Sequence, residues 1–245
     1  MRLALQMGED ERDVRRCNAA DARGLIETRW TDLGEFLFGF DAETRYRVVV
    51  ERRRNQLVGQ PPLPIDLLLY SPAAAKAPCT TFLGLNFRGN HGETSDPAVL
   101  LPSSWVPDSK DGSSANNRAT EKGRGAQSHR LPVEAIVREG CAVATAYYGD
   151  IDPDFDDNFA NGIHRLFPEH RPDEAHPNRW GSIAAWAWGL SRLMDVLEQI
   201  PEVDKERVIV FGHSRLGKTS LWAGANDTRF AGVISNDSGC GGAAL

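Results

Sequence analysis

The chain has 245 residues, of which 41% are hydrophobic and 25% are charged, and its formal net charge is -6. A chain of this length and composition can bury a sizeable core, which excludes a small fold held together mainly by disulfides. The acidic balance argues against a nucleic-acid partner. No apolar run reaches the length of about 18 residues that a membrane-spanning helix needs, so no membrane partner is expected.

The N-terminal segment 1–45 is rich in charge, with weak helical patterning and no sharp motif. We expect it to be a poorly determined leader or decoration and place the main domain at 46–245. The first residues do not form the core of an export signal, because Gly8, Glu9 and Asp10 interrupt the apolar stretch.

Strand and helix patterns alternate through the rest of the chain. Apolar runs predict strands at 46–50, 65–70, 80–85, 141–147, 207–211 and 230–235. Helical patterns lie at 133–139, 182–200 and 218–225. The polar segments 102–130 and 149–177 are predicted to be long loops. Strands that alternate with helices indicate an α/β fold around a largely parallel sheet.

The segment with the clearest chemistry is the strand-to-helix junction VIVFGHSRLGKT at 208–219. One interpretation is a P-loop, because Gly212, Gly217, Lys218 and Thr219 match its spacing residue for residue. The backbone N–H groups would then hold phosphates, Lys218 would reach the outer phosphates, and Thr219 would bind magnesium.

The other interpretation is a nucleophile elbow, in which Ser214 stands on a strained turn above the sheet. Gly212 would let the turn pack, and the backbone N–H of Arg215 would help to form an oxyanion hole. The usual spacing is Gly-x-Ser-x-Gly, and here the second glycine comes one residue late. The place of the motif favours the elbow: a P-loop usually follows an early strand, whereas nearly all predicted strands precede this one.

Six colinear segments of the chain resemble the glucuronoyl esterases of carbohydrate esterase family 15, in the α/β-hydrolase fold. These are DLLLY at 66–70, LGLNFRGNH at 83–91, AYYGDIDPDF at 146–155, WGSIAAWAWGLSR at 180–192, GHSRLGK at 212–218 and SNDSGCGGAAL at 235–245. The resemblance is to the bacterial branch. It implies an α/β-hydrolase-type sheet with flanking helices that is incomplete at the C-terminus, because family members continue beyond this point.

The resemblance also implies a reaction and a site. Family members hydrolyse the ester between a glucuronoyl group of xylan and an alcohol of lignin, through an acyl-enzyme and without a cofactor or metal, and they are usually exported. Ser214 would be the nucleophile, Arg215 would supply its backbone N–H and its guanidinium to the oxyanion, and Lys218 would bind uronate hydroxyls. Asp237 is either the catalytic acid, where glutamate is more usual, or a structural turn residue. Trp180, beside a polar loop, is a candidate for stacking on the sugar. The expected substrate is glucuronoxylan or a small uronate ester.

The catalytic base is missing from the expected set. A hydrolytic serine needs a base within reach, and in α/β-hydrolases the chain order is Ser, acid, His. None of the six histidines follows Ser214, and the side chain of neighbouring His213 should point away from it on a tight elbow. We therefore expect a truncated or fragmentary, catalytically incomplete esterase. The alternatives are a non-catalytic hydrolase-like remnant, an acetyl xylan esterase and the P-loop protein.

Overall fold

The computed structural model describes residues 26–38, 41–52, 63–72, 77–177 and 179–243. Its strands are β1 Ile26–Phe38, β2 Asp41–Arg52, β3 Leu63–Ser71, β4 Cys79–Asn86, β5 Ser114–Ala115, β6 Arg118–Ala119, β7 Ala142–Tyr147, β8 Val203–His213 and β9 Gly232–Asn236. Its α-helices are α3 Asn90–Glu93, α4 Val133–Arg138, α5 Tyr148–Ile151, α6 Ser182–Leu197 and α7 Arg215–Asn226. Short 3-10 helices are η1 Glu121–Gly123, η2 Ser128–Arg130, η3 Gly162–Arg165 and η4 Pro168–His170.

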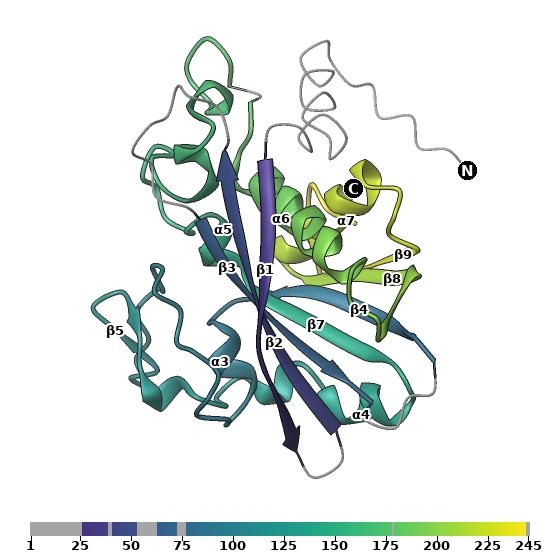
Figure 1. Cartoon of the computed structure of the whole chain (residues 1–245). Coiled ribbons are helices and arrows are strands. Elements are labelled where there is room, and N and C mark those ends of the chain that lie inside the picture. Colours follow the sequence, from purple (N-terminus) through teal and green to yellow (C-terminus); the bar gives the residue numbers. More distant parts are fainter. Residues whose placement is uncertain (1–25, 39–40, 53–62, 73–76, 178, 244–245) are drawn as a thin grey trace.

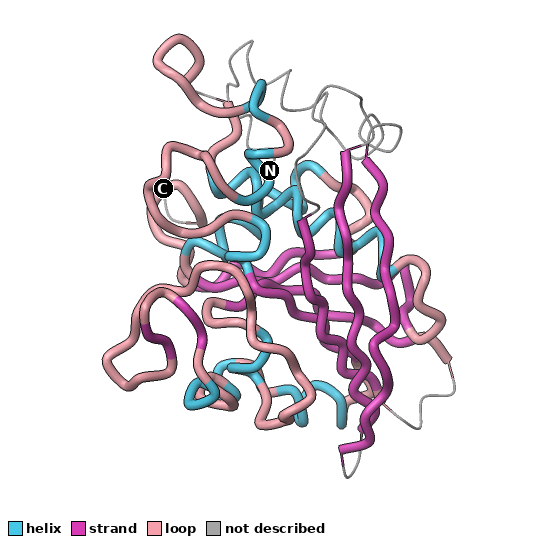
Figure 2. The backbone as a smooth tube through the Cα atoms, turned by 60° about the vertical axis from the view of Figure 1, so that its left-hand side comes forward, coloured by secondary structure: helices cyan, strands magenta, loops and turns pink. Residues whose placement is uncertain are grey.

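A seven-stranded mixed sheet with the order β1-β2-β3-β7-β4-β8-β9 forms the centre of the molecule (Figure 1). β1, β2, β3 and β7 pair antiparallel in sequence, whereas β7, β4, β8 and β9 are parallel neighbours. The sheet is strongly twisted, so that the long strands at one end cross those at the other in Figure 2. All the carboxyl ends of the parallel strands therefore meet at one edge of the sheet.

The two faces of the sheet carry separate apolar cores. Side chains that alternate along each strand point to opposite faces. One face packs against α5, α6 and α7 and forms the larger core, which contains Leu67, Leu83, Ala144 and Val210. The other face packs against α4 and the loop before it, through a smaller core with Val143 at its centre. This sandwich of helices around a sheet is the α/β architecture that the sequence predicts, and the match to α/β-hydrolase esterases described below confirms it.

The predicted strands and helices from residue 63 onward are confirmed, with small shifts at their ends. The helix predicted at 218–225 begins three residues earlier, at Arg215, and the strand predicted at 207–211 extends from Val203 to His213. The loop predicted at 102–130 also holds the β5–β6 hairpin. These differences matter most at the junction of β8 and α7, because the earlier start of the helix decides between the two interpretations of the motif.

The N-terminal part differs more from the prediction. Residues 26–38 and 41–52 form β1 and β2, so the weak helical patterning in this region was a wrong guide. Both strands pair into the main sheet, and β2 pairs with β3 from Ala42 to Val50. The boundary expected between residues 45 and 46 therefore falls inside β2. Residues 1–25 lie outside the described part of the chain.

Candidate active site

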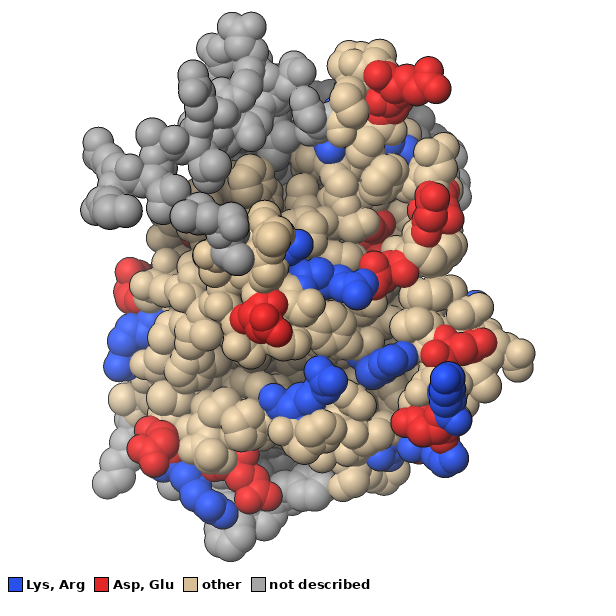
Figure 3. All heavy atoms as spheres, turned by 180° about the vertical axis from the view of Figure 1, so that it is seen from behind, with Lys and Arg blue, Asp and Glu red and all other residues tan. Residues whose placement is uncertain are grey.

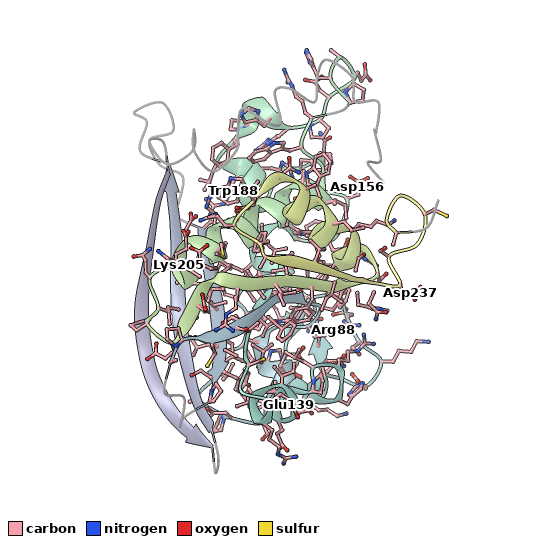
Figure 4. All side chains as sticks on the ribbon, turned by 90° about the vertical axis from the view of Figure 1, so that its right-hand side faces the viewer. Arg88, Glu139, Asp156, Trp188, Lys205 and Asp237 are labelled. Carbon is pink, nitrogen blue, oxygen red and sulfur yellow. The ribbon has the colours of Figure 1, made fainter. Side chains whose placement is uncertain are left out.

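Four segments with polar side chains follow the carboxyl ends of the parallel strands. They begin at Phe87 after β4, Tyr148 after β7, Ser214 after β8 and Asp237 after β9. In Figure 4, Arg88 and Asp237 lie toward one edge of the sheet, and Lys205 lies at the opposite edge. Ligand sites of open α/β sheets lie outside the carboxyl ends of the strands. The strand order thus gathers the predicted site residues Ser214 and Asp237 where such sites form.

Ser214 occupies a strained backbone position between β8 and α7. It caps the N-terminus of α7 with φ 56° and ψ -129°, a region that residues with a side chain seldom adopt. Its N–H donates to the Asn236 carbonyl at 2.9 Å, and its carbonyl accepts the N–H groups of Gly217 at 2.9 Å and Lys218 at 3.2 Å. The bend is therefore tied to β9 on one side and to the first turn of α7 on the other.

Two glycines permit the close packing around this bend. A Cβ on Gly212 would overlap the carbonyl group of Leu216 and would lie 2.7 Å from the Ser220 hydroxyl. A Cβ on Gly217 would lie 3.0 Å from the Cβ of Ser238. The second glycine, one residue later than in the usual motif, is thus needed where α7 crosses the end of β9. This arrangement is that of a nucleophile elbow.

The same geometry argues against the P-loop interpretation. In a P-loop the residues between the two glycines form a loop whose N–H groups face phosphate. Here α7 already begins at Arg215, and the N–H groups of Gly217 and Lys218 are bonded to Ser214. The spacing of the motif matches a P-loop, but its backbone donors at these two positions are occupied.

The side chain of Arg215 extends from the first turn of α7 to Asp154, in the loop after α5. Arg215 Nη1 donates to Asp154 Oδ2, and the same oxygen accepts the Tyr148 hydroxyl at 2.9 Å. Sequence reasoning did not predict this contact, because the two residues lie far apart in the chain and neither belongs to a motif that names the other. The pair lies beside the reactive end of the elbow.

An open pocket of about 440 Å³ adjoins this ion pair. Its wall is formed by the end of the Asp154 loop, the first turn of α6 and one face of α7. The lining residues are Asp154, Gly181, Ser182, Ile183, Ala184, Trp186, Arg215 and Trp222. Indole rings beside polar and charged groups suit a ligand that has both apolar faces and hydrogen-bonding edges.

Asp237 and Lys218 lie on the two elements that meet at the elbow. Asp237 directly follows β9, is exposed, and has a positive φ of 46°. It is the next residue after Asn236, whose carbonyl holds the Ser214 N–H. Lys218 is half-buried one turn into α7. The positive φ fits the turn interpretation of Asp237, and its place after β9 fits the acid interpretation.

Trp180 is in a different setting from the one that stacking on a sugar requires. It is 5% exposed and belongs to the main core. Its ring stacks on His170 with centroids 5.2 Å apart and also contacts Phe167. The contacts of the ring within the core replace the open face expected from the polar sequence before it. The exposed indole at this edge is instead Trp222, which lines the pocket and is half-buried.

The histidines of the described chain do not gather at Ser214. His213 Nδ1 lies 3.1 Å from the amide nitrogen of Asn236, its partner in the β8–β9 register. His91 and His164 are buried at 1% and 0% exposure. The exposed His176 pairs with Asp173, His170 stacks on Trp180, and His129 lies in η2. No recorded hydrogen bond joins any of these rings to Ser214.

A second, smaller pocket of about 160 Å³ lies at the ends of β4, β8 and β9, and Glu93 lines it. Glu93 is 7% exposed, and no hydrogen bond satisfies its Oε2 within the described residues. Burial raises the pKa of this carboxyl from 4.5 to about 7, although Arg130 opposes the shift. A carboxyl group whose pKa is higher in the folded state than in the unfolded chain makes folding less favourable as the pH rises from about 4.5 to about 7.

The substitution Glu93→Gln should therefore stabilise the protein at high pH. We expect its gain in unfolding free energy to be roughly 2 kcal/mol larger at pH 8 than at pH 5, because the charged form is buried only at pH 8. Urea denaturation at the two pH values measures this gain. Glu139→Gln is the matched control, because Glu139 is exposed after α4 (Figure 4). An equal gain at both pH values would contradict the assignment.

No helix in the described ranges is long and apolar enough to cross a membrane. Within those ranges there is also no cluster of three or more histidine, cysteine or acidic residues arranged to hold a metal ion. Lys and Arg side chains are interspersed with Asp and Glu over the face seen in Figure 3, where the described residues form no broad basic surface.

Comparisons with known proteins place the chain among carbohydrate esterases. Residues 165–245 match the family model described as glucuronyl esterase of fungi. A carbohydrate esterase from an unknown prokaryotic organism is 52% identical over 184 residues, which are 74% of this chain and 42% of that protein.

Two solved structures are also similar. A promiscuous esterase of carbohydrate esterase family 15 from a marine bacterial metagenome is 44% identical, with a TM-score of 0.75 over 90% of this chain and 54% of the other. A glucuronoyl esterase from Solibacter usitatus is 40% identical, with a TM-score of 0.75 over 89% and 53%. The chain spans about half the length of these relatives.

Proposed function

We propose that this chain, which belongs to the bacterial type of carbohydrate esterase family 15, carries the nucleophile and the oxyanion site of a serine esterase for glucuronoyl esters. The observation that carries the proposal is the backbone of Ser214. A serine with φ 56° at the end of β8, held by Asn236 and followed at once by α7, is the geometry that a nucleophile elbow needs.

The proposed reaction is acyl transfer through Ser214. Its hydroxyl attacks the uronate carbonyl, the C–O bond to the alcohol breaks, and water then hydrolyses the acyl-enzyme. The negative oxygen of the tetrahedral intermediate would lie at the N-terminus of α7, where the backbone N–H of Arg215 and its guanidinium donate to it. Lys218, one turn into the same helix, would donate to the hydroxyl groups of the sugar ring.

Asp237 is proposed as the acid that would orient a catalytic histidine, since it follows the strand next to the nucleophile strand. The histidines described above lack a recorded bond to Ser214, so we propose that the 245-residue polypeptide by itself turns over uronate esters at a rate near background. Trp180 is omitted from the proposed sugar site, because its ring is packed in the core. Substrate binding does not need the base and should be retained.

Imidazole in solution should partly replace the absent base. We expect added imidazole to raise hydrolysis of methyl D-glucuronate by this chain at least about tenfold above the rate in imidazole alone, because a positioned general base contributes on the order of 10²–10⁴ in rate. The measurement is methanol release over time. The variant Ser214→Ala should remove the enzyme-dependent part of this rate.

Three other outcomes would be informative. Rapid turnover without imidazole that Ser214→Ala abolishes would mean that a base in this chain reaches Ser214. Turnover that survives Ser214→Ala would refute the nucleophile assignment. Retained binding of the ester with no rescue by imidazole would favour a hydrolase-like protein that binds saccharide without catalysis.

A further inference from the structure

We propose that Asp154 is a specificity-determining residue, which pairs with Arg215 so that the site accepts the neutral uronate ester and rejects the free uronate anion. The inference rests on the proposed function, because it assumes that the uronate carboxyl group lies at Arg215. It concerns a residue outside the elbow, in the loop that follows α5.

The contact joins two parts of the chain that the fold brings together at the carboxyl edge of the sheet. Arg215 Nη1 donates to Asp154 Oδ2, and the side chains are 49% and 27% exposed. Both residues line the pocket beside Trp222. A ligand that enters this pocket therefore meets a cation and an anion together, and the local charge is close to zero.

Tyr148 fixes the carboxylate in this position. Its hydroxyl donates to the same Asp154 oxygen at 2.9 Å. Its ring is 2% exposed and packs edge-to-face against Phe87 at 5.6 Å and Trp186 at 5.0 Å between centroids. Burial raises the pKa of the Tyr148 hydroxyl, and the nearby Asp154 raises it further. Tyr148 therefore stays protonated, and Asp154 remains a fixed acceptor.

The other aspartates of this loop have different partners. Asp150 accepts the Ser104 hydroxyl at 2.6 Å, and the buried Asp152 lies 3.6 Å from His164. Asp156 and Asp157 accept backbone N–H groups within the loop itself. Among the recorded side-chain bonds and ion pairs of these five aspartates, those of Asp154 alone reach α7. The arrangement thus sets this carboxylate apart from a solvated acidic rim.

The chemistry of the reaction gives this pairing a purpose. The substrate is a neutral ester, whereas the product is a carboxylate of the same sugar. An unpaired arginine would bind that carboxylate with two parallel hydrogen bonds and would retain the product. With Asp154 in place, the free anion is repelled by one charge as it is attracted by the other. The ester oxygen still receives N–H donors, because Arg215 has further N–H groups besides the one that Asp154 accepts.

Binding of the two ligands tests the proposal without any turnover. The probes are D-glucuronate and methyl D-glucuronate, titrated into the 245-residue chain and followed by calorimetry or by ligand-observed NMR. We expect Asp154→Asn to tighten binding of D-glucuronate about three- to tenfold, which is the effect of removing one charge a few ångströms away in a partly exposed site. Binding of the methyl ester should change less than about twofold. The gain should shrink at high salt.

Two variants separate charge from structure. Asp156→Asn removes the same charge from an exposed position in the same loop (Figure 4) and should alter neither affinity. Tyr148→Phe keeps the Asp154 charge and should preserve the preference for the ester. If Asp154→Asn does not fold, Asp154→Ser removes the charge with a smaller side chain.

The two possible failures can be told apart. If the parent chain binds the ester and Asp154→Asn leaves the ratio of the two affinities unchanged, the role of Asp154 is refuted and the proposed function stands. If no form of the protein, the parent included, binds either ligand, the uronate site itself is wrong and the inference falls with it.

Discussion

Replacing Gly212 by alanine is expected to destabilise the chain by more than about 3 kcal/mol or to prevent stable folding. The new methyl group would overlap the carbonyl group of Leu216, which belongs to the backbone of α7. A flexible side chain could rotate away, but this carbonyl is held in the first turns of a helix that packs on β8 and β9. The strand and the helix would have to separate at the elbow.

Urea denaturation followed by circular dichroism measures the loss, and the soluble yield reports complete failure. Gly181→Ala is the matched control, because a Cβ on Gly181 meets nothing within 4 Å and its φ is an ordinary -87°. It should change the unfolding free energy by less than about 1 kcal/mol. Similar losses in both variants would show that close approach at Gly212 is not the cause.

Replacing Arg229 by methionine is expected to cost about 3–5 kcal/mol, the range for removing one partner of a buried ion pair. Arg229 donates to Asp227 at 2.6 Å and to Asp195 and Glu198 at 2.7 Å each. Asp227 is 6% exposed. Although burial opposes it, the bonds from Arg229 hold the pKa of Asp227 below its ordinary value. Without Arg229 the Asp227 charge would remain in a nearly dry site.

A matched exposed pair provides the control for this loss. Arg207 donates to Asp204 at 2.7 Å with side chains 57% and 27% exposed, and Arg207→Met should cost less than about 1 kcal/mol. Adding Asp227→Asn to Arg229→Met should recover part of the stability, because the uncompensated charge is then removed. Chemical denaturation of the four variants at pH 7 checks both statements. Equal losses for Arg229→Met and Arg207→Met would contradict the assignment of the first as a buried pair.

The parts of the fold that the sequence predicted are those with a strong local pattern. β7 is apolar at every position because it is covered on both faces, and α6 repeats apolar residues at helical spacing. β1 lacks such a pattern, and its place is set by pairing with β2 at the antiparallel end of the sheet. A strand that depends on its neighbour rather than on its own alternation is difficult to recognise alone.

The candidate site shows the same division. Ser214, Gly212 and Arg215 are adjacent in the chain, so the motif predicts the elbow directly. The pairing of Arg215 with Asp154 joins residues that are 61 positions apart, and no local pattern indicates it. Trp180 failed as a sugar-stacking candidate for a related reason. Its polar neighbours in sequence suggested exposure, whereas Phe167 and His170, brought in by the preceding loop, cover its ring.

The hydrogen bond from Ser214 to Asn236 also bears on whether the elbow can be treated as a transferable unit. The bend is encoded within a dozen residues, but one of the bonds that hold it comes from the next strand, beyond the whole of α7. A segment that ends with α7 would contain every letter of the motif and lack this support. Motif searches and grafting experiments that copy only the Gly-His-Ser-Arg-Leu-Gly segment would thus transplant a sequence without the structure that makes its serine unusual.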